Sequence, residues 1–244
     1  MKKIIIIILI SLVFIKTNYC QSLEVEVVYQ KALKKINDKT KSNPKILKGL
    51  NYFLQGNKSA SIFKFEKKLQ LDNGVNKRFI SRGGGGGLYY KNIKDSVRLE
   101  QKETIDGELY LISHKFKKYN WKLSKDSKNI GKYLCYKATA NYTEYNSIKK
   151  KNINFNIVAW YTPEISFPYG PSGYDGLPGL VLETKNGGFY FIASKVKITS
   201  NISKISPPKK GIKVTLKEFN EIILKKMENI FGKNFYEKNK KKKN

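Results

Sequence analysis

The sequence predicts an α+β protein that is mainly antiparallel β, with a C-terminal helix packed on the sheet. Three observations predict this fold: strict alternation of apolar and polar residues over 152–161, glycine-containing turn signals between neighbouring strand patterns, and one amphipathic helical pattern near the end. We expect a curved sheet or half-barrel, by analogy with envelope carriers that hold lipid-like ligands.

Six strands are expected in the first half of the chain. They cover residues 24–32, 50–55, 59–66, 88–92, 96–104 and 108–114. Asp106-Gly107 separates the last two and predicts a tight hairpin, because both central residues of that turn need positive φ. The run Gly83 to Gly87 predicts a flexible loop beside a binding surface, since neither a Lys-Ser nor a Lys-Thr pair follows it to complete a phosphate cradle.

The strands of the second half show the clearest periodicity. In 152–161 the residues expected to face the core are Ile153, Phe155, Ile157, Ala159 and Tyr161. In 132–142 they are Leu134, Tyr136, Ala138, Ala140 and Tyr142. Strands 179–184 and 189–198 flank Asn186-Gly187-Gly188, which predicts another hairpin.

One helix is predicted near the C-terminus. Thr215 and Glu218 form a capping box, and apolar residues recur at three- and four-residue steps after it. This stripe consists of Leu216, Phe219, Ile223, Met227 and Ile230. We expect the stripe to pack on the sheet.

The N-terminus has the layout of a secretory signal peptide. Lys2 and Lys3 precede an apolar run over 4–15, and a polar stretch leads to Cys20. We expect cleavage after residues 1–20, one β-rich domain over 21–232 and a basic disordered tail over 233–244; an uncleaved anchor and lipid attachment at Cys20 are the alternatives. The protein is therefore expected to be exported to the periplasm, an outer-membrane-associated location or the extracellular space.

The charge balance is strongly basic. The sequence holds 48 Lys and Arg residues against 19 Asp and Glu, with a formal net charge of +29. Only Arg78, Arg82 and Arg98 are arginine, which disfavours nucleic acid because phosphate and base recognition relies on the bidentate Arg fork. A solvated lysine surface and a weak, salt-dependent contact with anionic lipid or polysaccharide are the two readings that this charge favours.

Metal and nucleophile chemistry have few candidates in this chain. His114 is the single histidine, and Cys135 is the one cysteine outside the expected signal peptide. These two cannot assemble a soft-ligand metal site, so we expect no metal and no cofactor. Cys135 lies in a strand pattern and is expected to be a small buried hydrophobe, while His114 is expected to be structural or at the surface.

A glycine- and proline-rich motif follows the strand at 152–161. It reads YGPSGYDGLPGLVLE over residues 169–183, and an upstream block around 121–138 combines a Trp, a Gly, a Cys and a Lys-Ala pair. The chain resembles the GLPGLI family of exported Bacteroidota proteins, which is named after this hexapeptide; Val181 stands in place of its final Ile. The resemblance implies an exported β-rich protein and assigns no catalytic residue.

The motif has two readings. In the structural reading, Gly and Pro shape a rigid loop that enters a strand. Its residues are Gly170, Pro171, Gly176, Pro178, Gly179 and Leu180. In the binding reading, rigid turns present an apolar and aromatic rim beside an acid. That rim consists of Trp160, Tyr161, Tyr174, Leu177 and Glu183.

Three functions follow, in decreasing order of support from the residues. The first is a non-enzymatic envelope protein that binds an apolar ligand or an outer-membrane protein. The second is a structural or accessory subunit of an outer-membrane complex. The third is a hydrolase that uses acids near the GLPGL loop, such as Glu164, Asp175 and Glu183.

Overall fold

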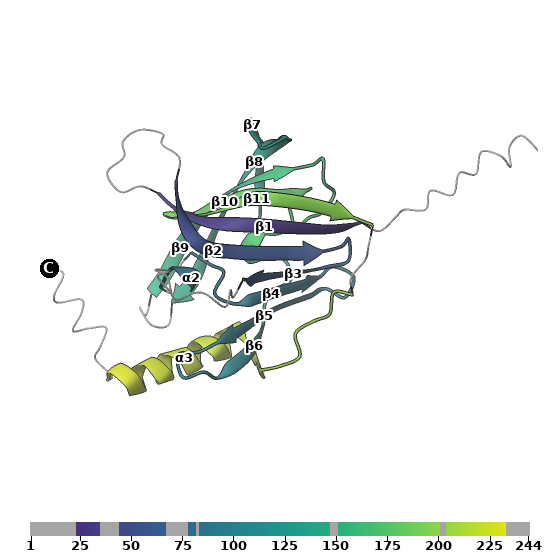
Figure 1. Ribbon diagram of the computed structural model, residues 1–244. Helices are drawn as coiled ribbons and strands as arrows, with labels where there is room; N and C mark the ends of the chain where they lie inside the picture. Colours follow the sequence, from purple (N-terminus) through teal and green to yellow (C-terminus); the bar gives the residue numbers. More distant parts are fainter. Residues whose placement is uncertain are drawn as a thin grey trace, which may run out of the picture.

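The computed structural model describes residues 23–34, 44–66, 78–81, 83–146, 151–200 and 204–232. The expected signal peptide and basic tail both lie outside these residues. The strands are β1 (Glu24–Leu33), β2 (Lys45–Gly56), β3 (Ala60–Phe65), β4 (Leu88–Asn92), β5 (Val97–Glu103), β6 (Leu109–Ser113), β7 (Lys122–Ile130), β8 (Tyr133–Asn146), β9 (Lys151–Thr162), β10 (Leu180–Asn186), β11 (Phe189–Thr199) and β12 (Ile212–Thr215). The helices are α2 (Arg78–Ser81), the 3₁₀ turn η1 (Pro171–Gly173) and α3 (Leu216–Phe231) (Figure 1).

The described strands form one sheet in the order β12-β6-β5-β4-β3-β2-β1-β11-β10-β9-β8-β7. The sheet is not closed, because β12 and β7 each have one neighbour. Every pair is antiparallel except β12 with β6, which run parallel from Ile212↔Tyr110 to Thr215↔Ser113. The expected fold class is therefore confirmed at the level of a mostly antiparallel sheet with a C-terminal helix.

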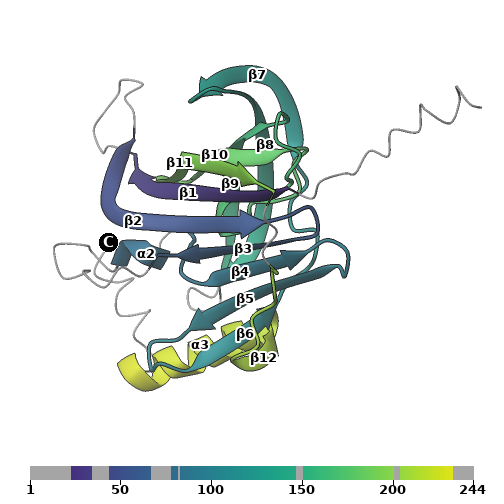
Figure 2. The ribbon, with the colours of Figure 1, turned by 45° about the vertical axis from the view of Figure 1, so that its right-hand side comes forward.

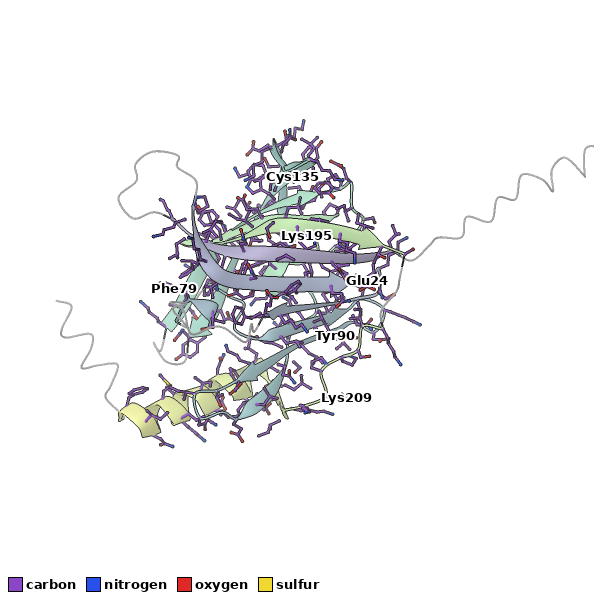
Figure 3. The ribbon with its side chains drawn as sticks, in the orientation of Figure 1. Glu24, Phe79, Tyr90, Cys135, Lys195 and Lys209 are labelled. Carbon is purple, nitrogen blue, oxygen red and sulfur yellow. The ribbon has the colours of Figure 1, made fainter. Side chains whose placement is uncertain are left out.

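The sheet bends strongly (Figure 2). Side chains of strands that are distant in its order share one core (side chains drawn in Figure 3). Phe63 of β3 and Cys135 of β8 belong to the same buried cluster, although β2, β1, β11, β10 and β9 lie between their strands. Tyr52 stacks on Phe63 at 5.6 Å between ring centroids and meets Phe191 edge-on at 5.0 Å. This curvature creates a concave side, which holds both the motif and the polar cleft described below.

The predicted strands are present with small shifts of their ends, and two strands were missed. β7 is largely exposed along its length and β12 spans only four residues, so neither carries the alternation that marks a half-buried strand. The 106–107 hairpin forms with a different turn. Only Gly107 has positive φ, and its amide donates to Thr104 O at 3.0 Å, as in a three-residue loop that ends in a left-handed glycine.

The start of β8 also differs from the predicted pattern. Leu134 is 42 % exposed, while Cys135, expected on the opposite face, is fully buried. The Leu134 amide donates to the Glu164 carboxylate at the surface, and the Cys135 thiol points into the main core. The expectation that Cys135 is a buried hydrophobe is confirmed, and burial raises the pKa of its thiol to about 11.

The predicted helix packs on β6 and β12. Thr215 Oγ1 accepts from the Glu218 amide at 3.3 Å, and the Glu218 carboxylate accepts from the Thr215 amide at 2.7 Å, which completes the capping box. Phe219 is buried against Tyr110 and Ile112, whereas Ile230 at the far end of the stripe is 50 % exposed. None of the described helices is sufficiently long and apolar to cross a membrane.

Candidate functional site

The motif loop, defined here as residues 163–179, joins β9 to β10 and folds back into the concave side of the sheet. Its apolar side chains are buried and join the core clusters: Ile165, Phe167, Tyr169, Tyr174 and Leu177. Its backbone is tied to β10, because the Leu180 amide donates to Ile165 O and the Val181 amide to Tyr169 O, both at 3.1 Å. The motif therefore fills the core.

Two glycines of the loop lie where no side chain fits. A Cβ at Gly170 would collide with Tyr174 O and Val181, and one at Gly179 would collide with the Thr162 carbonyl. Gly179 also has a φ of 151°, which favours glycine. Pro171 opens η1, whereas Gly176 and Pro178 are exposed.

The predicted binding residues do not form one exposed rim. Leu177 and Tyr174 are only 1 % and 3 % exposed. Tyr161 packs with Leu177 in a small cluster, while Trp160 lies on the opposite face of β9, under the Lys128 ammonium 4.5 Å from its ring centroid. Neighbouring residues of a strand point to opposite faces, which separates Trp160 from Tyr161.

The acids near the motif do not converge either. Glu183 accepts from Lys128 Nζ at 2.7 Å, and Glu164 accepts from the Leu134 amide. Asp175 is buried and pairs with Lys91 and, at 3.7 Å, with Arg98. The three carboxylates have separate partners, which gives the arrangement no shared acid-base pair.

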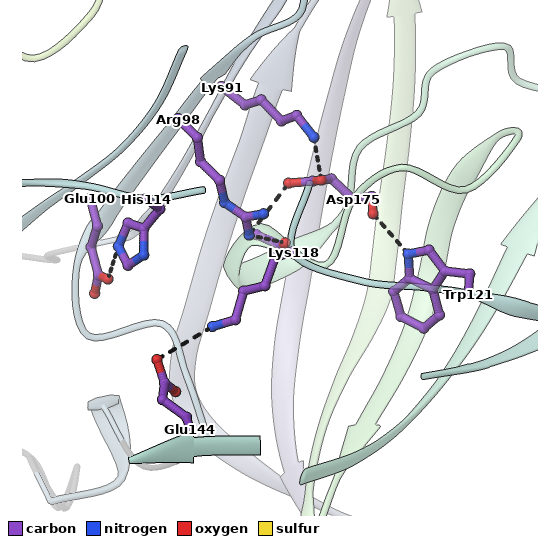
Figure 4. Close-up of polar contacts among 9 residues, drawn as sticks. Lys91, Arg98, Glu100, His114, Lys118, Trp121, Glu144 and Asp175 are labelled. Carbon is purple, nitrogen blue, oxygen red and sulfur yellow. Dashed lines mark hydrogen bonds and ion pairs between the residues drawn. The ribbon is translucent and has the colours of Figure 1, made fainter. Parts of the chain in front are cut away.

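A cleft of about 460 Å³ opens beside the loop on the concave side. Its walls come from β5 and β6 with α3 on one side and from β8 and β9 on the other, and Ser172 and Tyr174 of the loop form part of its lining. Polar side chains line the cleft together with Tyr89: Arg98, Glu100, His114, Lys118 and Glu144, which Figure 4 shows. Side chains of both halves of the curved sheet thus meet in one cavity.

Hydrogen bonds link the polar side chains along one wall. The Gly85 amide donates to Ser172 Oγ at 3.0 Å, the Tyr89 hydroxyl is hydrogen-bonded to both Ser172 and Glu100, and His114 Nε2 lies 3.0 Å from Glu100 Oε2. Burial, and then the charge of Glu100, raise the pKa of Tyr89 well above its usual value.

Glu100 is held as a carboxylate at the centre of this wall. Burial raises its pKa, but the hydrogen bond from His114 and the charge of Lys102 outweigh burial, so that the net shift is downward. His114, expected to be structural or at the surface, is half-buried and lies in the cleft as the partner of Glu100.

The glycine run forms the rim of the cleft and is closely packed. Gly83 lies against Phe189, and Gly85 against Tyr52 and Phe191. The ammonium of the fully buried Lys31 donates to Gly84 O at 2.6 Å and to Ile80 O at 2.9 Å. The run, expected to be a flexible loop, is thus a packed rim in contact with the core.

A second cavity of about 990 Å³ adjoins the cleft between α3 and the end of β8. It shares His114, Lys118, Tyr142 and Glu144 with the cleft, and Leu216 and Leu224 of α3 add apolar surface. Among the described residues, no group of three His, Cys, Asp or Glu side chains could hold a metal ion. The arrangement is suited to noncovalent binding of a molecule with polar and apolar parts.

Sequence reasoning missed the residues that carry the polar centre of the cleft. Arg98, Glu100 and Lys118 lie in or after strands and carry no motif. The one available signal was rarity, since Arg98 is one of three arginines in a chain that otherwise uses lysine.

Comparisons with known proteins support the fold and leave the function open. Residues 142–183 match the family model described as "Protein of unknown function (Porph_ging)", which covers the end of β8, β9 and the motif loop. No curated protein matches the chain. The structure is similar to PNGF-II in the C2 and P21 crystal forms, with TM-scores of 0.55 and 0.54 and 18 % and 19 % identity over 84 % of this chain. The chain spans about a third of PNGF-II, and the likeness shows a shared fold alone.

Proposed function

We propose that this protein is a non-enzymatic binding protein of the cell envelope that takes a small ligand with an apolar part into its concave cleft. The observation that carries the proposal is the cleft itself, a cavity of about 460 Å³ continuous in its lining with one of about 990 Å³. Both volumes lie within the usual range of small-molecule sites. The curved sheet would serve as a half-barrel around the ligand.

The lining supports an apolar contact. Tyr142 and Phe155 stack at 4.8 Å between centroids, and Ile153 and Ile223 line the same cavity from β9 and α3. Aromatic side chains supply much of the binding energy at such sites because they bury large areas.

The compartment is proposed from the sequence. The apolar N-terminal run predicts export, and the family-model match at residues 142–183 fits the resemblance to GLPGLI proteins at a coarse level. We propose on this basis an exported GLPGLI-type protein in the periplasm, at the outer membrane or outside the cell.

A neutral apolar dye tests the proposal. We expect Nile red to bind in saturable fashion with one site per chain and a rise in fluorescence. Asn220→Trp places a large ring where α3 lines both cavities and should weaken binding at least about tenfold, or 1.4 kcal/mol. Lys225→Trp, at an exposed position of the same helix outside both linings, is the matched control. Unsaturable dye binding, or equal binding by the two variants, would remove the cleft as the site.

An accessory subunit of an outer-membrane complex is the second candidate, and one observation favours it. β7 is an edge strand with one neighbour, and Leu123 on it and Leu134 beside it are 57 % and 42 % exposed. Exposed edges with apolar residues can pair with another chain. This function would be supported instead if the protein fails to bind the dye but binds an outer-membrane protein through β7, and if Leu123→Lys abolishes that binding.

A further inference from the structure

Arg98 is a buried cation whose hydrogen-bonding capacity is only partly used. Its side chain is 6 % exposed, and Nη2 donates to Gly173 O at 2.7 Å and lies 3.7 Å from Asp175. Nη1 is buried and has no hydrogen-bond partner among the described residues. A buried polar nitrogen without a partner is unfavourable, so Nη1 has a donor that a group bound in the cleft could use.

Lys118 is the second cation of this corner of the cleft. Its ammonium lies 4.7 Å from the Tyr142 ring centroid and 5.8 Å from that of Tyr119. Its ion-pair partner Glu144 is 3.9 Å away, too far for a hydrogen bond. Burial lowers the pKa of Lys118, and the charge of Arg98 lowers it further against the opposing effect of Glu144.

The two cations face the same aromatic ring. The Arg98 guanidinium carbon lies 5.6 Å from the Tyr119 ring centroid, so Tyr119 contacts both positive groups. In Figure 4 the Lys118 ammonium reaches toward Glu144. Two neighbouring cations in a partly desolvated cleft repel each other, and an anion between them would relieve the repulsion.

Basic side chains outnumber acidic ones around the two cavities. The basic side chains in their combined lining are Arg98, Lys102, Lys115, Lys117, Lys118 and Lys217. The acidic ones are Glu100, Glu144 and Glu221, and Glu100 is already engaged with His114. The excess of positive charge attracts anions into the cleft.

We propose that the ligand is an amphipathic anion whose carboxylate or phosphate headgroup binds between Arg98 and Lys118. Its apolar part extends past Tyr142 into the cavity between β8 and α3. The inference rests on the proposed function and specifies the ligand class at the same cleft. Arginine and lysine suit such headgroups because charge-assisted hydrogen bonds to oxyanions are stronger than neutral ones.

Three probes with the same chain length separate headgroup from tail. Isothermal titration calorimetry with dodecanol, dodecanoate and dodecyl phosphate, each in monomeric solution, measures affinity for a neutral, a carboxylate and a phosphate headgroup. We expect at least one anion to bind about tenfold or more tightly than dodecanol. A preference for one anion over the other would identify the headgroup.

Two variants with opposite expected effects on anion affinity test whether the Arg98–Lys118 corner of the cleft causes the preference. Lys118→Met should lower anion affinity about tenfold and change dodecanol affinity less than about twofold, since it removes charge and keeps a similar chain length. Glu144→Gln should raise anion affinity by a few fold because it removes a competing carboxylate. Lys125→Met, exposed on β7 outside both cavities, is the control. Arg98→Gln serves as a further test where its thermal unfolding shows a folded protein.

The outcomes separate the two proposals. Equal affinity for all three probes would mean that only water completes the Arg98 hydrogen bonds. That result would overturn the anion site and leave the apolar cleft in place. An anion preference that Lys118→Met does not reduce would overturn it as well. If none of the three probes binds and Nile red does not bind, both the proposed function and this inference fail.

Discussion

The motif loop and the cleft lie next to each other on the concave side of the sheet, but they are built in opposite ways. The loop is closely packed, with Tyr169, Tyr174 and Leu177 in the core; its amides donate within the loop, and its carbonyls accept from the amides of β10. The cleft is hollow, and its polar groups retain unused hydrogen-bonding capacity at Arg98 and Lys118. The segment that is most conspicuous in the sequence is therefore the scaffold. The side chains suited to a ligand lie beside it, Arg98 on β5 and Lys118 in the connection from β6 to β7.

The two regions also meet at defined atoms. Gly173 O accepts from Arg98, and the Trp121 indole donates to Asp175 O at 2.9 Å (Figure 4). Ser172, which has a φ of 52°, accepts a hydrogen bond through its hydroxyl oxygen from the Gly85 amide at the cleft rim. The loop can thus position the cleft without binding the ligand itself, and the following predictions test this division.

The largest effect is expected at Gly179. Gly179→Val would force a β-branched residue into a φ of 151° with its Cβ against the Thr162 carbonyl, so we expect a loss of about 4 kcal/mol or failure to fold. Gly188→Ala is the control, because a Cβ there meets no atom within 4 Å and the change should stay within about 0.5 kcal/mol. Urea unfolding measures both. A Gly179→Val protein as stable as the wild type would contradict the scaffold role.

Tyr174 belongs to both regions and gives an intermediate effect. Its ring is buried 5.6 Å from that of Tyr119, and its hydroxyl accepts from Asn186 Nδ2 at 2.9 Å. Tyr174→Ala should lower the free energy of unfolding by about 3 kcal/mol and Tyr174→Phe by about 1 kcal/mol. Denaturant titration of the pair separates packing from the hydrogen bond. An unchanged stability in Tyr174→Ala would contradict the structural role and favour the reading of Tyr174 as a binding residue.

Lys31, which holds the rim of the cleft, should give the most specific signal, a stability that depends on pH. Burial lowers the pKa of Lys31 to about 7, so between pH 7 and about 10 the unfolded chain binds more protons than the folded one. Stability of the wild type should therefore rise with pH relative to Lys31→Met, by at most about 1.4 kcal/mol per pH unit. Thermal unfolding from pH 7 to 9.5 measures the slope, with Lys64→Met at an exposed site as control. Parallel pH profiles of wild type and Lys31→Met would refute a charge-sensitive rim.

Much of the fold could be predicted from local patterns. The alternation in β9, the glycine turn before β11 and the Thr215–Glu218 capping box each depend on a few neighbouring residues. β7 and β12 could not be predicted in this way, because an exposed edge strand and a four-residue parallel strand need no apolar alternation.

The candidate site was much less predictable. The motif glycines and the buried Cys135 were recognised, but an exposed rim was expected where Tyr174 and Leu177 are buried. Arg98, Glu100 and Lys118 were not recognised at all. Their relevance comes from contacts with β8 and the motif loop, which are distant in the sequence.

The sequence by itself determined the strands with a buried face and the capped helix, because each depends on interactions between near neighbours in the chain. The positions where only glycine fits depend on contacts with distant residues, as Gly179 does on the Thr162 carbonyl. The tertiary structure alone decided that β5 and β6 face β8 and β9 across a cleft. The concave face of the sheet packs around the motif loop and the aromatic core. That packing is a property of the whole sheet, and it brings Arg98 and Lys118 together beside Tyr119.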